Sequence, residues 1–347
     1  MSEEGRKREL SRRELLRAGA FGAASLAAAS GALALRRVSA QEAAVPALPP
    51  GTIGHQMHGQ NAPVGTTRGD FDPMRYLKRF DTGRVSQLPS GQTLREYSMV
   101  AIDKEIEIAP GVFFPAWTYN GEVPGPTLRA TEGDRVRIHF VNSGSHPHTI
   151  HFHGIHPSNM DGVFEIVDPG QSFTYEFDAE PFGLQLYHCH AIPLKRHIHK
   201  GLYGVFIIDP KQGRPPANEM VMVMNAFDTN FDNDNEIYAV NTVGFCYNSQ
   251  PIPLKLHELN RVYLVNMTEF DLINSFHLHG NFFKVFRTGS NLEHFEFTDN
   301  LMLCQGERAV LEFSFKFPGR YMFHAHQSEF AELGWMGMFD VREELNA

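Results

Sequence analysis

The feature of this chain that most restricts its fold is an order of strand-like segments that occurs twice. In each copy a strand rich in branched residues leads to a segment with a His-X-His pair, then to another strand and to a segment with a second His-X-His pair. The first copy reads RVRIHFVN, HTIHFHG, SFTYEFD and LQLYHCH, and the second reads RVYLVNM, SFHLHG, RAVLEFSF and RYMFHAH. Alternating aromatic and β-branched residues between Gly, Pro and Asn turns are typical of antiparallel β-sandwiches. The sequence therefore predicts an all-β chain of two tandem sandwich domains.

The repeat also predicts where the domains begin and end. We expect an N-terminal arm over residues 41–92, a first domain over residues 93–212 and a second domain over residues 213–347, with a polar, Pro-rich linker over residues 211–218. A chain of 347 residues is long enough for each domain to bury its own core.

Residues 1–40 are predicted to be an export signal. Basic residues precede an uncharged Ala/Gly/Ser-rich run over residues 18–35, and the small residues of VSA end the segment at a possible cleavage site. The run SRRELL resembles a twin-arginine export signal, so we expect a periplasmic or secreted protein. The alternative is a retained membrane anchor. We expect no stable membrane insertion, because an Ala/Gly/Ser segment is weakly hydrophobic.

The charge of the chain excludes one class of partner. The formal net charge is −9, and removal of the eight basic and four acidic residues of the signal would leave −13. Nucleic-acid binding needs basic side chains that neutralise phosphates, so we expect no nucleic-acid partner. An acidic surface is compatible with cationic or neutral reductants.

Eight of the 18 histidines occur in four His-X-His pairs, two pairs in each repeat. Residues two apart on a strand point to the same face, so each pair can bind metal on a single face. Scattered core or surface histidines would not produce the same pairs at matching positions. The pairs are His151/His153, His188/His190, His277/His279 and His324/His326.

Cys189 lies between the two histidines of one pair and should therefore point to the opposite, inward face of its strand. His148 from the other strand, and His197 or His199 from the following loop, would complete an inward site. Two imidazoles and a thiolate with a weak axial position form a blue-copper electron-transfer centre. Leu202 would occupy the axial position without binding the metal, which favours Cu(I) and a higher potential.

The second repeat lacks this inward site. Ala325 replaces the cysteine, and Asn274 stands three residues before His277, where a histidine would be needed. We expect Met336, at the position that corresponds to Leu202, to serve as core packing.

These motifs resemble those of the two-domain multicopper oxidases built from Greek-key cupredoxin domains, relatives of laccases and of copper nitrite reductases. HTIHFHG is similar to the family pattern His-x-x-His-x-His, and YHCHAIPLKRHIHKGL is similar to the family's His-Cys-His segment. The resemblance implies four coppers per chain: one type 1, one type 2 and two type 3. It implies type 1 copper on His148, Cys189 and His197, type 2 copper on His151 and His277, and type 3 copper on His153, His188, His190, His279, His324 and His326.

The spacing after the cysteine leaves one of these ligands open. His197 follows Cys189 by eight positions, a longer loop than in three-domain laccases and more similar to nitrite reductases. His199 is the alternative ligand. The five-residue distance from His197 to Leu202 fits the family spacing and favours His197.

The resemblance implies a laccase-like oxidase. It would oxidise a phenolic compound or a metal ion by single electrons at type 1 copper, and reduce dioxygen to water at a trinuclear cluster. Each domain offers only four of the eight cluster histidines, so the cluster must form where a first domain meets a second, in the family between subunits of a homotrimer. The alternatives are a copper nitrite reductase, typically with aspartate in place of His151 and methionine in place of Leu202, and a non-catalytic electron carrier. Phenols, Mn(II), Fe(II) and Cu(I) all remain open as reductants.

Several residues outside the ligand set have two interpretations. In the family an acidic residue at the position of Asp161 helps to protonate reduced oxygen, and a solvated turn aspartate is the alternative. Glu165 and Asp168 are weaker candidates for the same role. Four further histidines line an entry path, bind a substrate metal or lie at the surface, the last being the favoured interpretation: His55, His58, His146 and His156. Cys246 and Cys304 either form a disulfide or are two free, buried thiols.

Overall fold

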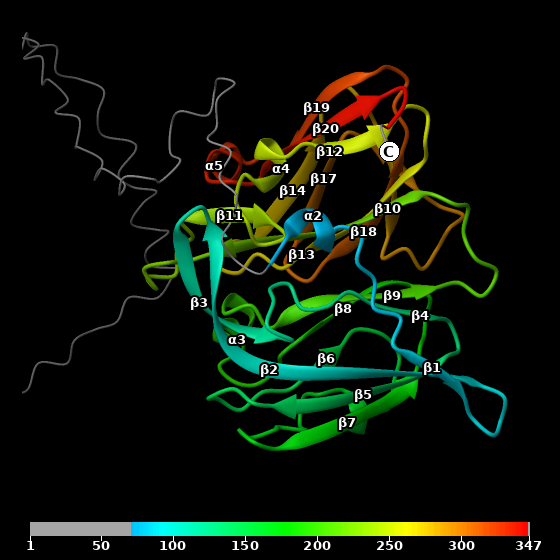
Figure 1. Ribbon diagram of the computed structural model, residues 1–347, viewed down its shortest axis with the longest axis vertical. Coiled ribbons are helices and arrows are strands. Elements are labelled where there is room, and N and C mark those ends of the chain that lie inside the picture. The colour runs from blue at the N-terminus through cyan, green and yellow to red at the C-terminus, as the bar shows by residue number, and fades with distance from the viewer. Residues whose placement is uncertain (1–70, 346–347) are drawn as a thin grey trace, which may run out of the picture. The chain divides into compact units, whose positions relative to one another are not determined.

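The computed structural model describes residues 71–345. The predicted export signal, most of the predicted arm, His55 and His58 lie outside the described residues. The regular structure of the described part consists mostly of strands, which form four sheets (Figure 1), so the all-β prediction is confirmed.

The four sheets are numbered here in chain order. The first sheet contains β1 (Arg84–Gln87), β2 (Thr93–Ala109), β3 (Val112–Tyr119), β5 (Arg135–Asn142) and β7 (Ser172–Asp178). The second contains β4 (Leu128–Thr131), β6 (His151–Phe152), β8 (Gly183–His188) and β9 (Tyr203–Asp209). The third contains β10 (Asn218–Phe227), β11 (Ile237–Val240), β13 (Asn260–Asn266), β15 (Phe283–Arg287), β16 (Glu296–Thr298) and β18 (Arg308–Phe313). The fourth contains β12 (Ile252–Lys255), β14 (Ile273–Leu278), β17 (Asn300–Cys304), β19 (Gly319–His324) and β20 (Met336–Arg342). The short helices are α2 (Pro73–Tyr76), η1 (Ser158–Met160), α3 (Leu194–His199), α4 (Cys246–Ser249) and α5 (Ser328–Glu332).

Three hydrophobic cores hold the four sheets in layers. One core lies between the first and second sheets, one between the second and third, and one between the third and fourth. Strand β10 belongs to two of them, since Val221 and Val223 pack toward the second sheet while Met222 and Met224 pack toward the fourth. The two sandwiches therefore share a buried apolar interface in addition to their own cores.

The strand pairing differs in one respect from the antiparallel sandwiches that the sequence predicts. Each sheet contains one parallel pair: β2 with β5, β4 with β9, β10 with β13, and β12 with β20. The reason is that the chain crosses between sheets. Between β2 and β5, for example, it enters the second sheet as β4 and then returns in the same direction. The parallel pairs recur in both repeats, as expected of two copies of one unit.

Part of the predicted arm is built into the fold. Asp72 caps α2 by accepting a hydrogen bond of 2.9 Å from the N–H of Met74. Tyr76 and Leu77 are buried in separate cores. Strand β1 then pairs with β2 at the edge of the first sheet.

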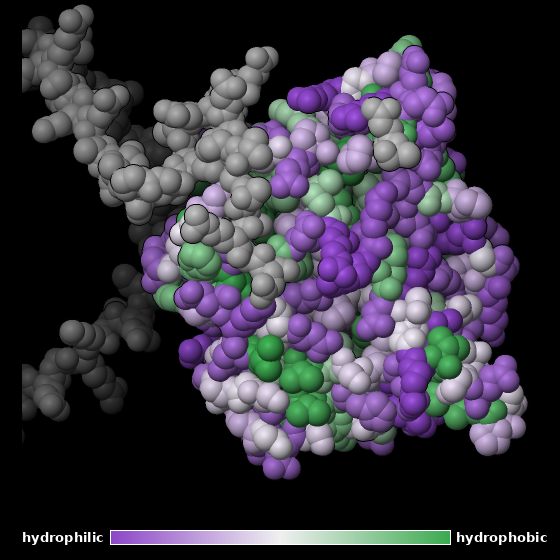
Figure 2. Space-filling view, viewed as in Figure 1, coloured by the Kyte–Doolittle hydropathy of each residue, from purple (hydrophilic) through white to green (hydrophobic). Residues whose placement is uncertain are grey.

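The surface of the described chain is mostly polar. On the face shown in Figure 2, hydrophobic side chains form separate small patches within a largely hydrophilic surface. Among residues 71–345, no helix combines the length and the apolar character needed to cross a bilayer.

All three cysteines are free thiols in the structure. Cys189 and Cys246 are buried, whereas Cys304 is exposed, so the expectation of a buried thiol is wrong for Cys304. Its position on β17 explains the difference, because Leu303 points into the core and the next side chain points to the opposite face.

The expected role of Met336 is also wrong. Met336 pairs with His324 in the same register in which Tyr203 pairs with His188, so the residue that corresponds to Leu202 is Trp335. Trp335 is fully buried, and its carbonyl accepts from the N–H of Ala325. A large aromatic side chain thus fills the core of the second domain at the place that corresponds to Leu202.

We predict that Trp335→Ala destabilises the protein by about 3–5 kcal/mol, because it leaves a large cavity in a close-packed core. Urea unfolding would measure the change. Phe317→Ala is the matched aromatic control, because Phe317 is 70% exposed, and it should cost less than about 0.5 kcal/mol. An equal effect of the two substitutions would contradict the assignment of Trp335 to the core.

Candidate metal centre

The tripeptide at the end of β8 divides its side chains between two faces. Cys189 is fully buried in the core of the first sandwich and contacts His148 and His197. The His188 and His190 rings lie on the other side, each in contact with His151. The opposite orientation predicted from strand geometry is therefore what the structure shows.

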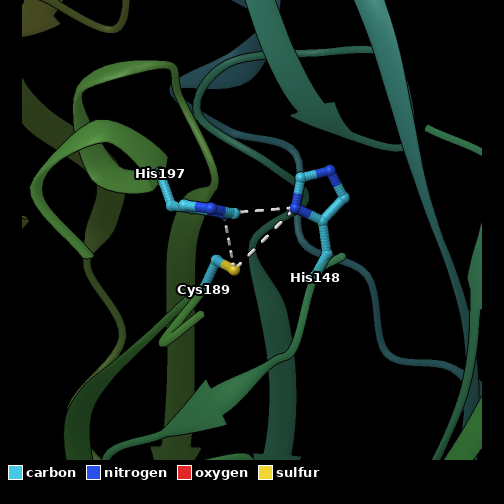
Figure 3. Close-up of side chains that lie close together, drawn as sticks. All are labelled: His148, Cys189 and His197. Atoms are coloured by element: carbon cyan, nitrogen blue, oxygen red, sulfur yellow. Dashed lines mark hydrogen bonds between the residues drawn. The ribbon is translucent and has the colours of Figure 1, made fainter. Parts of the chain in front are cut away.

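The inward cluster consists of His148, Cys189 and His197 (Figure 3). The Cys189 Sγ atom lies 3.2 Å from Nδ1 of His197 and 4.0 Å from Nδ1 of His148, and the two Nδ1 atoms are 3.2 Å apart. Three ligand atoms thus converge on one buried point. Thr149 donates its backbone N–H to the sulfur at 3.4 Å, which stabilises negative charge there.

The chemistry of this donor set suits a soft metal ion. Burial, and then the neighbouring His197, lower the pKa of His148 to about 3, and burial lowers the pKa of His197 to about 4. Both imidazoles are therefore neutral near pH 7 and offer lone pairs. Burial raises the pKa of Cys189, so its thiol needs a cation to become a thiolate. The Nε2 atom of His148 is buried without a hydrogen-bond partner among the described residues. Two imidazole nitrogens and one thiolate are the ligands of a blue-copper site.

The structure brings His197, and not His199, to Cys189. His199 points away from the cluster: its Nε2 accepts from the N–H of Asp228 at 3.1 Å, and its ring packs against Phe114 and Phe270. Both histidines belong to α3 and are two residues apart, so they leave the helix in different directions.

Leu202 is buried in the same core as the cluster. Its carbonyl accepts from the N–H of Cys189 at 2.9 Å, and its own N–H donates to the carbonyl of His197 at 3.2 Å. These bonds hold the cysteine strand and the histidine helix together.

A second group of histidines lies on the opposite face of the second sheet. His151 is its centre, with ring centroids 5.2 Å from His153, 5.1 Å from His188 and 5.4 Å from His190. The Nε2 atoms of His153 and His188 face each other at 3.4 Å. Burial lowers the pKa of His153 to about 3 and that of His188 to about 4, so neither imidazole is charged near neutral pH. We refer to these four histidines as the first half-site.

The second domain carries a matching group on the fourth sheet, the second half-site. His277 is its centre, with ring centroids 4.9 Å from His279, 5.4 Å from His324 and 5.3 Å from His326. The Nε2 atoms of His279 and His324 face each other at 2.9 Å. Burial lowers the pKa of His279 and of His324. In each half-site one Nε2–H can donate to the facing Nε2, or, when both protons are held at Nδ1, both lone pairs face one point where a metal ion can bind. Both half-sites therefore suit metal ions.

Backbone carbonyls orient the imidazoles in the same way in both half-sites. His188 donates from Nδ1 to the carbonyl of Cys189 at 2.9 Å, and His324 donates to that of Ala325 at 2.6 Å. The two central histidines follow a common pattern as well: the Nδ1 of His151 donates to the carbonyl of Asp161 at 2.7 Å and that of His277 to the carbonyl of Asp299 at 2.8 Å. A proton held at Nδ1 leaves Nε2 free to bind metal.

Asp161 also brings its carboxylate to the first half-site. Its Oδ1 lies 3.1 Å from Nδ1 of His151 and 3.6 Å from Nε2 of His156. The expectation of a surface histidine is wrong for His156, whose side chain is 6% exposed and bonds the carbonyl of Phe152. Glu165 instead accepts from the N–H of Gly162, and Asp168 is exposed.

Within one chain the two half-sites lie on different layers. His188 follows the alternation of Leu186, which faces the third sheet, so the first half-site lies on that side of the second sheet. His277 alternates with Phe276 and Leu278, which face the third sheet from the fourth, so the second half-site lies on the outer face of the fourth sheet. Two sheets, spaced by about 10 Å, separate the groups.

Two family models described as multicopper oxidase match the chain, one over residues 103–213 and the other over residues 213–344. Together they span both sandwiches. The chain belongs to the multicopper oxidase family. Its two-domain, cupredoxin-like architecture is the one that the paired repeats predict, and copper is the metal of this family.

Solved structures and curated relatives support the assignment. A crystal structure described as a multicopper oxidase is 57% identical, with a TM-score of 0.78, and covers 79% of this chain and 98% of that chain. Copper nitrite reductase from Nitrosomonas europaea is 25% identical, with a TM-score of 0.69, and covers 73% of this chain and 95% of its own. The copper-containing nitrite reductase of Neisseria meningitidis is 31% identical over 249 residues, 66% of this chain and 64% of the relative. The chain thus spans slightly less than two thirds of that relative's length.

Two residues that the motifs did not predict lie beside the sites of this multicopper oxidase. Trp117 of β3 packs on the rings of His148 and His197 at 5.4 and 4.9 Å. Arg308 of the third sheet approaches Nδ1 of His153 at 3.5 Å and donates to the carbonyl of Leu184. Neither belongs to a histidine motif, so only the packing of distant strands reveals them.

We predict that the metal-free protein loses stability as the pH falls below about 6.5, the pKa of an unfolded histidine. Folding lowers the pKa of His148 to about 3 and those of His188 and His197 to about 4. Between these values and pH 6.5 the three imidazoles are protonated in the unfolded chain and neutral in the folded chain. Each of these buried histidines should contribute about 1.4 kcal/mol per pH unit between pH 6.5 and the folded pKa. Urea unfolding at several pH values would measure the slope.

The variant His148→Gln should reduce that slope, whereas the control His139→Gln should not, because the side chain of His139 is 48% exposed. Equal slopes in both variants would contradict the attribution.

Proposed function

We propose that this chain is a laccase-like multicopper oxidase that couples one-electron oxidation of a small reductant to four-electron reduction of dioxygen to water. The observation that carries the proposal is the tripeptide at residues 188–190, in which one side chain belongs to the inward cluster and its two bonded neighbours belong to the first half-site. Reductant and dioxygen can then react at separate places that a few covalent bonds connect. The overall balance is four electrons and four protons per dioxygen, giving two waters.

The donor sets fit four coppers per chain. His148, Cys189 and His197 would hold type 1 copper, with Leu202 at the non-ligating axial position. The trinuclear cluster would be held by type 2 ligands His151 and His277 and by type 3 ligands His153, His188, His190, His279, His324 and His326. Copper would supply one-electron redox chemistry at both places. The protein residues orient the imidazoles, keep them neutral and exclude water from the inward cluster.

The number of imidazoles favours an oxidase over a nitrite reductase, although nitrite reductases are among the relatives. A single copper at a subunit interface takes about four ligands, whereas two half-sites of four histidines each offer eight. A non-catalytic electron carrier would need no second histidine-lined face at all.

We propose further that the trinuclear cluster forms between subunits of a homotrimer. The two half-sites lie on different layers of one chain, so a first half-site can meet a second half-site only on another chain. Repeated around a threefold axis, such a head-to-tail contact closes in a ring. Apolar residues are exposed beside both half-sites: Ile155 (62%) follows His153, and Met302 (60%) pairs with Ser275, two residues from His277. A partner subunit would cover them.

Asp161 has the geometry of a proton relay. Its carboxylate lies beside His151, at the edge of the first half-site, and is partly exposed. It can therefore take protons from water and pass them toward the position of reduced oxygen.

We propose that residues 1–40 direct the protein to the periplasm or beyond by the twin-arginine route. This route transports folded proteins, which agrees with a protein that carries copper.

Copper analysis and an oxygen electrode test the function. We expect about four coppers per wild-type chain, blue colour and oxygen uptake with a phenol. Cys189→Ser should lose the colour and the oxygen uptake but keep the other three coppers, because serine cannot replace the thiolate. About two coppers per chain with nitrite reduction would instead favour a nitrite reductase, and blue colour without oxygen uptake would favour an electron carrier.

Complementation tests the shared cluster. One variant, His151→Ala/His153→Ala, lacks the first half-site, and another, His277→Ala/His279→Ala, lacks the second, so each alone should be inactive. Co-expressed in equal amounts, they should recover about a quarter of the wild-type activity, since that share of interfaces would combine two intact halves. The control replaces the second variant by the fourfold variant, which cannot complement. No recovery in the mixed trimers would mean that the cluster does not form between chains.

A further inference from the structure

A pocket of about 420 Å³ lies beside the inward cluster, between α3 and the loops of the second domain. On one side it is lined by residues of α3 and its end, including Lys195, Arg196 and Lys200. On the other side it is lined by Phe231 and Phe270, which belong to the second domain. Its volume is that of a site for a small molecule.

The charge of this pocket is opposite to that of the whole chain. The chain has a formal net charge of −9, yet three cations line the pocket and Asp228 is its one acidic lining residue. The Asp228 carboxylate is already engaged, since it accepts from the N–H groups of Phe231, Asp232 and Asn233 in its own loop. The Asp228 carboxylate therefore makes no ion pair with the three basic side chains of the pocket.

Lys200 is the member that most needs a partner. It is only 8% exposed, and its ammonium makes no hydrogen bond or ion pair within the described residues. The Asp103 carboxylate acts on it only from beyond ion-pair distance. Its Nζ lies over the rings of Phe114, Trp117 and Phe231 at 4.8, 5.9 and 5.2 Å. Aromatic faces offset only part of the cost of burying a charge. An anion bound in the pocket would supply the rest.

The walls of the pocket suit a flat ring. Phe231 is 55% exposed, and the His199 ring packs beside Phe270 at 4.8 Å. Lys195 also lies over Phe270, with its Nζ 4.4 Å from the ring centroid. Exposed aromatic faces next to cations are suited to an aromatic ring that carries a negative group.

Trp117 joins this pocket to the inward cluster. Its ring lies 5.3 Å from the guanidinium of Arg196 and 5.9 Å from Nζ of Lys200 on the pocket side. On the other side it packs on the rings of His197 and His148. A molecule in the pocket is therefore separated from the cluster by few side chains, one of which is an extended aromatic system.

We propose that this pocket binds the reductant and selects an anionic aromatic compound, such as a phenol that bears a carboxylate, with the carboxylate at Lys200 and the ring against Phe231 and Phe270. The proposal rests on the oxidase function proposed above. The bound phenol loses one electron and its phenolic proton to become a phenoxyl radical, and dioxygen is the final acceptor of the electron. Mn(II), Fe(II) and Cu(I) are cations, which the three basic side chains disfavour.

Oxygen uptake by the copper-loaded protein with syringate and with its methyl ester tests this selection, because the two phenols differ in the negative charge. We expect KM for syringate to be about tenfold lower than for the ester, the effect of one charged hydrogen bond. Lys200→Met should remove this preference by raising KM for syringate alone. Lys195→Gln, at an exposed position, should reduce it in part and is informative even if Lys200→Met folds poorly.

The matched control is Lys284→Met, since Lys284 also lies over a phenylalanine, Phe295 at 4.5 Å, but does not line the pocket. It should change neither KM. Wild-type protein without a preference for syringate, or pocket variants that affect both phenols equally, would overturn the proposal.

Calorimetric binding of 4-methoxybenzoate, which has no phenolic proton to lose, separates this proposal from the oxidase function. We expect wild-type protein to bind it and Lys200→Met to bind it about tenfold more weakly. Oxygen uptake without such binding would overturn the pocket and leave the oxidase function intact. Binding that depends on Lys200 in a protein that consumes no oxygen would support the anion pocket and refute the oxidase.

Discussion

The alternation of side chains along a β-strand is the constraint on which the rest of this structure depends. At the end of β8 it sends Cys189 into the core of the first sandwich and His188 and His190 to the opposite face. Two chemically different donor sets thereby come from residues that are joined by a single peptide bond. The inward set is buried and contains sulfur, whereas the outward set consists of imidazoles alone. No longer-range feature is needed to connect them.

Burial on both faces of the central sheets gives this arrangement its rigidity. Strands β8, β9, β10 and β13 are almost entirely buried, since the second and third sheets each pack between two other sheets. Their backbone carbonyls and neighbouring side chains hold the histidines in defined tautomers. The same layering separates the half-sites within one chain, and this separation is the basis of the proposal that a second chain completes the cluster.

The sequence predicted the metal-binding side chains better than the packing and strand register around them. The all-β repeat and the grouping of histidines follow from spacing alone, because a period of two on a strand is a local property. The choice of His197 over His199 needed the path of α3, which turns the second imidazole toward Asp228. The correspondence of Leu202 with Trp335, rather than Met336, needed the strand register. A loop of different length in the two repeats conceals that register from counting.

Taken by itself, the sequence determined which side chains share a face and which repeat lacks a thiolate, since both depend only on neighbours along the chain. Tertiary structure alone decided that the half-sites lie apart, that Trp117 packs on the inward cluster, and that Lys200 is buried in a pocket completed by the second domain. Those contacts join residues far apart in the chain. Their position depends on how whole sheets pack, which no local pattern of residues records.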